Sequence, residues 1–337
     1  MTCSHGQSED LKKAAEILVA GGLVALPTET VYGLAADARQ GEAVRRIYEA
    51  KGRPNFNPLI VHVSDLDKAR EIGQFDEVSS LIVQHFWPGP LTIVVPLKKE
   101  AGISDAVTAG LSTIALRAPD HGLSQELLTL SGLALAAPSA NSSGKISPTS
   151  AEHVRGDLGA KVDFILDGGE TRRGLESTIV KVERDEETGQ PIIICLRPGP
   201  ITVEELERVT DLKVHSPQIG IDETGKSESH EGNSTPIAPG ALLRHYAPSV
   251  PVRLDALEVN AGEGLLGFGT EDLSELQDLP FFNLSEVGDL EEAAQRLFAG
   301  LHWMDKQGVT GIAVRPIPHV GVGVALNDRL KRAAHSA

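Results

Sequence analysis

Residues 23–63 read LVALPTETVYGLAADARQGEAVRRIYEAKGRPNFNPLIVHV, and this stretch decides the fold expected for the first part of the chain. Its first four residues, 23–26, are apolar and end at Pro27, which is typical of a short strand. A polar triplet, Thr28 to Thr30, then follows the strand end, where loops commonly carry function.

The next segment predicts a helix over residues 42–50, because Ala43, Val44 and Ile47 recur at helical spacing. Lys51 and Arg53 follow on a short loop that we expect to be exposed. Two cations so placed could hold a polyphosphate, one as a point charge and the other as a planar fork. A solvated helix end, where cations are favoured anyway, explains the same residues.

Residues 58–63 predict another strand, in which Ile60 and His62 share one face. His62 is therefore a polar residue on an apolar strand, and both a hydrogen-bonded structural histidine and a ligand-binding one fit. Residues 113–117 alternate in the same way and place Arg117 inside a strand. A buried arginine needs an anion, which is either a substrate carboxylate or a structural salt bridge.

Small hydroxyl residues follow an apolar strand at residues 134–137. The run 138–149, PSANSSGKISPT, would let a ligand approach the backbone and offers hydroxyl and N–H groups to phosphate. An ordinary serine-rich loop is the alternative. Arg197 ends a further predicted strand, 192–196, and again places a cation at a strand end.

The composition changes after residue 203. Residues 216–239 are rich in Ser, Gly, Glu, Pro and Thr, which predicts a mobile linker. Short strands and helices then alternate between residues 250 and 334, a pattern that predicts a small second α/β domain with a parallel sheet.

Composition limits the function. The chain has 337 residues and a formal net charge of −16, which disfavours nonspecific binding to nucleic acid or to an anionic membrane. Its two cysteines cannot form a CxxC site, and no metal-spaced His/Cys cluster exists in the sequence. With neither a membrane-span-length apolar run nor a signal pattern, we expect a cytoplasmic protein.

Seven motifs in order resemble one family, the long, two-domain threonylcarbamoyl-AMP synthases of the Sua5/YrdC type. The motifs are PTETVYGL (27–34), KGRP (51–54), NPLIVH (57–62), PSAN (138–141), EST (176–178), LRPG (196–199) and RHYAP (244–248). Any one of them is weak evidence, but the ordered set is specific. The residues at 241–243, Ala-Leu-Leu, depart from the family pattern.

The resemblance implies a YrdC-like twisted mixed sheet with flanking helices over residues 8–203. It also implies a linker or lid over 204–249 and a smaller Rossmann-like α/β domain over 250–337. The implied reaction joins L-threonine, bicarbonate and ATP, accompanied by Mg²⁺, into threonylcarbamoyl-adenylate and releases pyrophosphate. The product would pass to the tRNA threonylcarbamoyl-transferase machinery, which modifies adenosine 37 of ANN-decoding tRNAs.

The resemblance also implies the site residues. The threonine site would comprise Thr30, His62, Arg117, Ala137 and Ser177. The nucleotide site would comprise Lys51, Arg53, Asn57, Thr113, Ser139, Ser147, Arg197 and Tyr246. Lys51 and Arg53 would face the phosphates and act in catalysis, and Tyr246 would end a lid that closes over the cleft.

Two other classes compete with this interpretation. An RNA-binding module is disfavoured by the acidic balance and the 4% aromatic content. A carbamoyl-adenylate enzyme of hydrogenase maturation contains a related domain, but that class carries zinc-finger-like cysteines that this sequence lacks.

Overall fold

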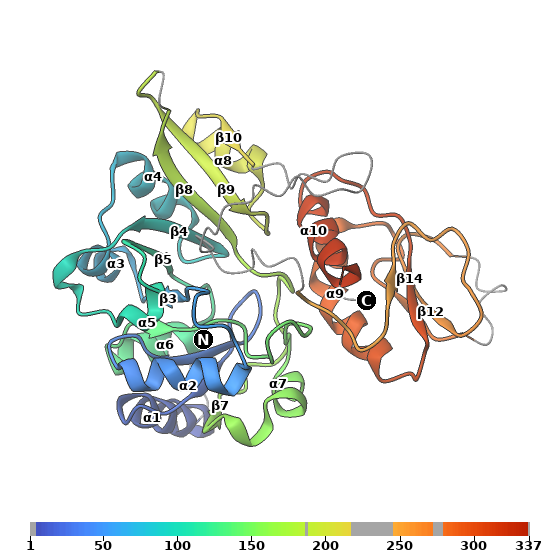
Figure 1. The fold of residues 1–337 in the computed structure, drawn as a ribbon, viewed down its shortest axis with the longest axis horizontal. Coiled ribbons are helices and arrows are strands. Elements are labelled where there is room, and N and C mark those ends of the chain that lie inside the picture. The colour runs from blue at the N-terminus through green and yellow to red at the C-terminus, as the bar shows by residue number, and fades with distance from the viewer. Residues whose placement is uncertain (1–4, 186–187, 217–244, 272–278, 336–337) are drawn as a thin grey trace.

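The computed structural model describes residues 5–185, 188–216, 245–271 and 279–335, which form two α/β units. Figure 1 shows a larger unit, coloured from blue to yellow, beside a smaller unit in orange and red. The predicted fold class, a mixed sheet with flanking helices plus a smaller α/β domain, is confirmed. Most of the predicted lid and the unusual 241–243 segment lie outside the described residues.

The first unit is built on a ten-stranded mixed sheet with the order β10-β9-β8-β4-β5-β3-β6-β2-β1-β7. Its strands are β1 (Val24–Leu26), β2 (Gly33–Asp37), β3 (Ile60–His62), β4 (Leu91–Pro96), β5 (Thr113–Arg117), β6 (Leu135–Ala136), β7 (Phe164–Ile165), β8 (Thr178–Arg184), β9 (Pro191–Arg197) and β10 (Val214–His215). Strand β3 is central, since it runs parallel to β5 on one side and antiparallel to β6 on the other.

Helices flank this sheet. They are α1 (His5–Val19), α2 (Gly41–Lys51), α3 (Leu66–Ile72), α4 (Glu77–Phe86), α5 (Asp105–Thr108), α6 (Gly122–Ser131), α7 (Ala151–Asp157) and α8 (Val203–Thr210), with 3-10 turns η1 (Lys99–Ala101) and η2 (Gly159–Lys161). Helix α2 ends as its sequence predicts, because Gly52 takes a left-handed conformation at φ 60° and donates its N–H to the last turn. No helix in the described parts of the chain is long and apolar enough to cross a membrane.

Side chains of β3 and β5 alternate between the two faces of the sheet, as the sequence predicts. Val61 and Leu116 point into the main hydrophobic core, while Ile60 belongs to a separate small apolar cluster. The β3–β5 register places His62 beside Arg117. Since neighbouring residues in register project from the same face, a polar pair lies on the sheet face opposite the main core.

Residues 204–215 belong to the linker or lid predicted for 204–249, but they form most of helix α8 and the strand β10 of the first unit. Thr202 caps α8 with a full capping box, in which its hydroxyl accepts from the Glu205 N–H and the Glu205 carboxylate accepts from the Thr202 N–H. Leu206 is fully buried in the main core, and β10 pairs with the edge strand β9. The ordered first unit thus extends to His215, because one apolar helix face and a strand edge anchor this segment.

The second unit has a four-stranded parallel sheet with the order β11-β14-β12-β13. Its elements are β11 (Val252–Arg253), β12 (Glu263–Gly267), β13 (Phe281–Asn283), α9 (Leu290–Asp305), β14 (Gly311–Val314) and α10 (Gly323–Ala334). The parallel α/β arrangement predicted from the alternating pattern is confirmed.

The two units share a hydrophobic cluster. Val31, Ile146 and Leu175 of the first unit belong to the same buried cluster as Phe298 of α9 and Leu326 of α10. Figure 1 shows α9 and α10 on the side of the second unit that faces the first. The cavity described next therefore has the second unit directly behind one of its walls.

Candidate active site

A cavity of about 50 Å³ lies on the polar face of the central sheet. The residues predicted for the site that line it are Arg53, His62, Arg117, Ala137, Ser139, Ser177, Arg197 and Tyr246. His62, Arg117 and Arg197 are the last residues of β3, β5 and β9, and the others lie on loops and turns, so the cavity lies where several strands end. The fold brings together residues separated by almost 200 positions in the chain.

Arg117 forms a structural salt bridge, which was one of the two alternatives left open by its sequence position. Its guanidinium forms a buried ion pair with Glu29, at 2.8 Å between Nη2 and Oε1, and donates a 2.8 Å hydrogen bond to Thr30 Oγ1. It also lines the cavity. A guanidinium has five N–H donors, so the salt bridge leaves capacity for a substrate carboxylate.

The turn after β1 holds this arrangement in place. Thr28 Oγ1 donates to the carbonyl of Val31 at 2.7 Å and lies 2.8 Å from Thr30 Oγ1. Pro27 is followed directly by this closed turn, which explains why β1 stops there. Thr30 itself is fully buried and contacts Arg117 rather than lining the cavity.

Arg197 and Ser177 form a second fixed pair. The Arg197 guanidinium donates from Nε and Nη2 to the Ser177 carbonyl at 3.0 and 2.9 Å, and from Nη2 to Ser177 Oγ at 3.1 Å. Ser177 Oγ also lies 2.7 Å from Thr92 Oγ1. Both residues are buried, so their positions are set before any ligand arrives.

The expectation that Lys51 and Arg53 lie on an exposed loop is wrong. Their side chains are buried, at 4% and 8% exposure. Lys51 Nζ donates to the carbonyls of Ser139 and Asn141, and the loop carrying those carbonyls covers the helix end. Arg53 does line the cavity, whereas Lys51 supports the wall behind it.

Four more predicted residues do not line the cavity. Ser147 donates its hydroxyl to Glu176 at 2.5 Å, and Asn57 accepts through its carbonyl from Tyr48. Thr113 is the partly exposed first residue of β5. The fourth is Thr30, described above.

Several lining residues were not assigned a role from the sequence. They are Thr28, Val31, Gly33, Ile60, Pro138, Glu176 and His245. All seven stand inside quoted motifs, and the polar side chains of Thr28, Glu176 and His245 were the signal that could have assigned those three a role. The others contribute backbone or apolar surface and carry no chemical signature.

The electrostatics of the cavity favour an anion. Three guanidinium groups line it, those of Arg53, Arg117 and Arg197, and Glu176 is the carboxylate among its described lining residues. Burial, the largest cause, lowers the pKa of Arg53 and of Arg197 to about 10, and neighbouring guanidinium groups add to the effect. A polyanionic ligand would stabilise the charged form of these closely spaced, buried arginines.

The two histidines of the cavity are neutral. Burial lowers the pKa of His62 to about 3, and the positive charge of Arg117 lowers it further. Burial likewise lowers the pKa of His245 to about 3. Nδ1 of each ring is buried without a hydrogen-bond partner among the described residues. The rings can therefore hydrogen-bond a ligand but are poor proton donors at neutral pH.

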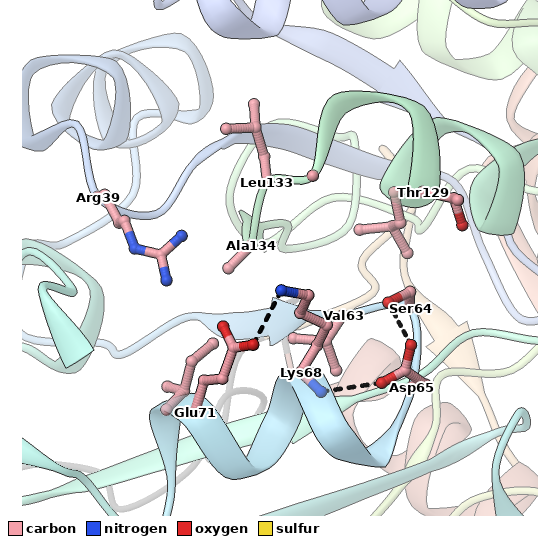
Figure 2. A pocket seen from close by; sticks show the side chains of 12 residues that line it. Arg39, Val63, Ser64, Asp65, Lys68, Glu71, Thr129, Leu133 and Ala134 are labelled. Atoms are coloured by element: carbon pink, nitrogen blue, oxygen red, sulfur yellow. Dashed lines mark hydrogen bonds and ion pairs between the residues drawn. The ribbon is translucent and has the colours of Figure 1, made fainter.

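A larger cavity, of about 220 Å³, lies between α3 and the end of α6 (Figure 2). Figure 2 shows that Lys68 pairs with Glu71 and that Asp65 bonds Ser64 and the backbone of Lys68, whereas Arg39 stands apart from them and donates to the carbonyl of Ala101 at 3.4 Å. This cavity contains none of the predicted site residues. Size alone would select this cavity, but buried unpaired polar atoms and concentrated charge favour the smaller one.

The described residues contain no cluster of three or more His, Cys, Asp or Glu side chains suited to a metal. Glu176, the one carboxylate among the described residues that line the cavity, is already engaged by Ser147 and by Arg329 of α10. These residues fit a Mg²⁺ ion that arrives on nucleotide phosphates better than one held by the protein alone.

Two family models match the chain. Residues 16–199 match the model for Sua5, YciO and YrdC proteins, which is described as "Telomere recombination". Residues 201–335 match "Threonylcarbamoyl-AMP synthase, C-terminal domain". Together the two matches span almost the whole chain.

Named relatives agree with these matches. A threonylcarbamoyl-AMP synthase of Bacillus subtilis is 40% identical, covering 96% of this chain and 92% of its own length. The Pyrococcus abyssi enzyme of the same name is 38% identical, with 96% and 94% coverage.

Solved structures give the same picture. The crystal structure of P. abyssi Sua5 complexed with L-threonine superposes with a TM-score of 0.82 and 37% identity, covering 97% of this chain and 94% of that one. Escherichia coli YciO, at 22% identity and a TM-score of 0.50 over 59% of this chain and 93% of its own, shares the fold of part of the chain.

Proposed function

The chain belongs to the Sua5 family of threonylcarbamoyl-AMP synthases, enzymes that transfer an AMP group, and we propose that it makes threonylcarbamoyl-adenylate from L-threonine, bicarbonate and ATP. The observation that carries this proposal is the group of three buried guanidiniums around one small cavity, beside neutral histidines. The positive charge of this pocket favours anionic groups, such as a carboxylate and phosphates, over a neutral substrate.

L-Threonine would lie against the β3–β5 face. The P. abyssi relative has been crystallised with L-threonine, which supports the same ligand here. Arg117 would bind the carboxylate, since its contacts with Glu29 and Thr30 fix the orientation of the guanidinium. His62 and Ser177 would bind the remaining polar groups, and Ala137 would leave room for the side chain.

The nucleotide would occupy the part of the cavity near Arg53 and Arg197. Both guanidiniums are anchored by backbone carbonyls, Arg53 by Asn57 and Pro58 and Arg197 by Ser177. They therefore present charge to the phosphates without moving, which is the arrangement that stabilises a developing transition-state charge best. Mg²⁺ on the phosphates would supply further charge neutralisation.

The reaction needs no covalent protein intermediate. Bicarbonate converts the threonine amine to a carbamate with loss of water. A carbamate oxygen then attacks the α-phosphorus of ATP, a new P–O bond forms, and the bond to pyrophosphate breaks. The protein supplies position and charge, which is consistent with a cavity that offers no thiol or other strong nucleophile among its described lining residues. The acceptor would be the machinery that modifies tRNA in the cytoplasm.

A pyrophosphate-release assay tests the proposal. Release is expected only when ATP, threonine and bicarbonate are all present, and mass spectrometry of the quenched mixture should detect threonylcarbamoyl-adenylate. Release that is independent of threonine would contradict the proposed function, as would hydrolysis of ATP without the acyl-adenylate product.

A further inference from the structure

Arg329 is a fully buried arginine that belongs to the second unit but reaches the first. It lies on α10, with its side chain at 0% exposure. Its Nε forms a 2.8 Å ion pair with Glu176 Oε2, and its Nη2 donates to the carbonyl of Pro198 at 3.0 Å. The guanidinium carbon also lies 5.3 Å from the ring centroid of Tyr246, a cation–π distance.

The ion pair with Arg329 affects the charge and position of Glu176. Glu176 lines the candidate cavity, and its other oxygen, Oε1, accepts the hydroxyl hydrogen of Ser147 at 2.5 Å. Burial raises the pKa of Glu176, but Arg329 and then Arg197 outweigh that effect and bring the pKa below its ordinary value. Glu176 is thus ionised, and a negative charge stands in the wall of a cavity that suits an anion.

An unpaired carboxylate at this position would oppose nucleotide binding. In a buried site, like charges repel far more strongly than in water. Arg197 also faces Glu176, but it is committed to Ser177 through several hydrogen bonds. Arg329 makes the direct ion pair, and Asp328 and the carbonyl of Pro198 fix its guanidinium from behind.

We propose that Arg329 is a positioning residue of the nucleotide site, which neutralises Glu176 and holds it against Ser147 so that a polyphosphate can enter. The second unit then contributes a charge that the site requires, in addition to any part it plays in covering the cleft. This inference rests on the proposed function, because it assumes that the cavity binds a nucleotide.

The test compares Arg329→Met with the double variant Arg329→Met/Glu176→Gln. The single variant leaves a buried carboxylate uncompensated, whereas the double variant removes both charges and retains similar side-chain volumes. Replacing a whole buried ion pair is commonly tolerated while removing one partner is not, so the single variant should weaken ATP binding by about tenfold or more. The double variant should recover most of that loss.

Two controls distinguish the loss of charge compensation at Glu176 from a general disturbance of the folded structure. Adenosine carries no phosphate charge, so its affinity should change far less than that of ATP in Arg329→Met. Arg173→Met removes a different ion pair between the units, the exposed Arg173–Glu291 contact at 3.2 Å, and should leave ATP affinity close to that of the parent protein. Isothermal titration calorimetry gives each affinity, and thermal unfolding confirms that each variant is folded.

The outcomes are distinct. A parent protein that does not bind ATP contradicts the proposed function itself. A parent that binds ATP, together with a double variant that is as weak as Arg329→Met, or an equal loss for adenosine and ATP, overturns the inference alone. If Arg329→Met does not fold, Arg329→Lys and the double variant both keep the site electrically balanced. Each should then bind ATP within about tenfold of the parent, and failure of both overturns the inference.

Discussion

Burial determines how the Arg117–Glu29 pair contributes to stability. Both side chains are almost inaccessible, at 5% and 2% exposure, so neither charge can be solvated if the other is removed. Arg117→Met should therefore lower the free energy of unfolding by about 3–5 kcal/mol, as for other broken buried pairs. Urea denaturation measures the change. The double variant Arg117→Met/Glu29→Gln should regain most of the stability, and an equally unstable double variant would show that the pair is not coupled.

Recognition of the threonine hydroxyl is a second property of individual residues. His62 Nδ1 is buried with no hydrogen-bond partner in the described part of the chain, and Ser177 Oγ is fixed by Thr92 and Arg197, so the site offers polar atoms that can bond a ligand hydroxyl. A site built to bind a hydroxyl rejects an analogue that lacks it more strongly than one that lacks a methyl group. Serine should therefore be a much better substrate than 2-aminobutyrate in the pyrophosphate assay. Equal rates would show that the hydroxyl is not recognised.

At the scale of elements, the segment before β8 depends on a close backbone contact. A Cβ on Gly199 would lie 2.4 Å from the Thr178 nitrogen and 2.8 Å from the Glu176 carbonyl oxygen. Backbone atoms cannot yield as a flexible side chain can, so Gly199→Ala should displace the segment that carries Glu176 and Ser177. We expect at least about a tenfold loss in kcat/KM, since small displacements in a preorganised site have large effects.

Gly189→Ala is a suitable comparison for that variant. Gly189 has a positive φ of 67°, so alanine is strained there, but the position has no neighbour within 4 Å. Gly189→Ala should lower the free energy of unfolding by about 1 kcal/mol and leave kcat/KM unchanged. If Gly199→Ala behaves in the same way, the close contact does not control the site.

The strands were predictable from the sequence where their side chains alternate. The period of two predicted that His62 shares a face of β3 with Ile60 and that Arg117 lies within β5, whereas the register that sets the two side by side is seen only in the structure. The burial of Lys51 could not be predicted, since it depends on carbonyls that lie about 90 positions later in the chain. Helix α8 was not predicted, because its segment was assigned to the polar linker. Its capping box, Thr202 with Glu205, is a sequence pattern that indicates a helix start.

At the scale of the whole molecule, contacts between the units were beyond sequence reasoning. Glu176 and Arg329 are 153 positions apart, and although Glu176 stands in a quoted motif, nothing in the sequence pairs it with Arg329. The same interface contains His153 of α7 stacked on His302 of α9, with ring centroids 3.9 Å apart and an interplanar angle of 19°. His302 Nε2 lies 3.2 Å from the carbonyl oxygen of Ser147, the residue whose hydroxyl bonds Glu176 in the cavity wall.

The stacked histidines predict that the protein loses stability in mild acid. Burial lowers the pKa of each ring to about 4, and for both rings the charge of Lys306 lowers it further. An unfolded histidine titrates near 6.5, so between these values the unfolded chain binds more protons than the folded chain. The stability gained from the neutral pair is complete above 6.5 and decreases as the pH falls toward 4.

His302→Gln should reduce this pH dependence, because the glutamine can still bond the Ser147 carbonyl but does not titrate. We expect the free energy of unfolding to fall less between about pH 7 and pH 5 in the variant than in the parent protein. His62 and His245, with their own lowered pKa values, keep part of the dependence in both proteins. His319→Gln, at an exposed position, should leave the slope unchanged. Urea titrations across this range would contradict the prediction if all three proteins gave the same slope, since the stacked pair would then titrate as it does in the unfolded chain.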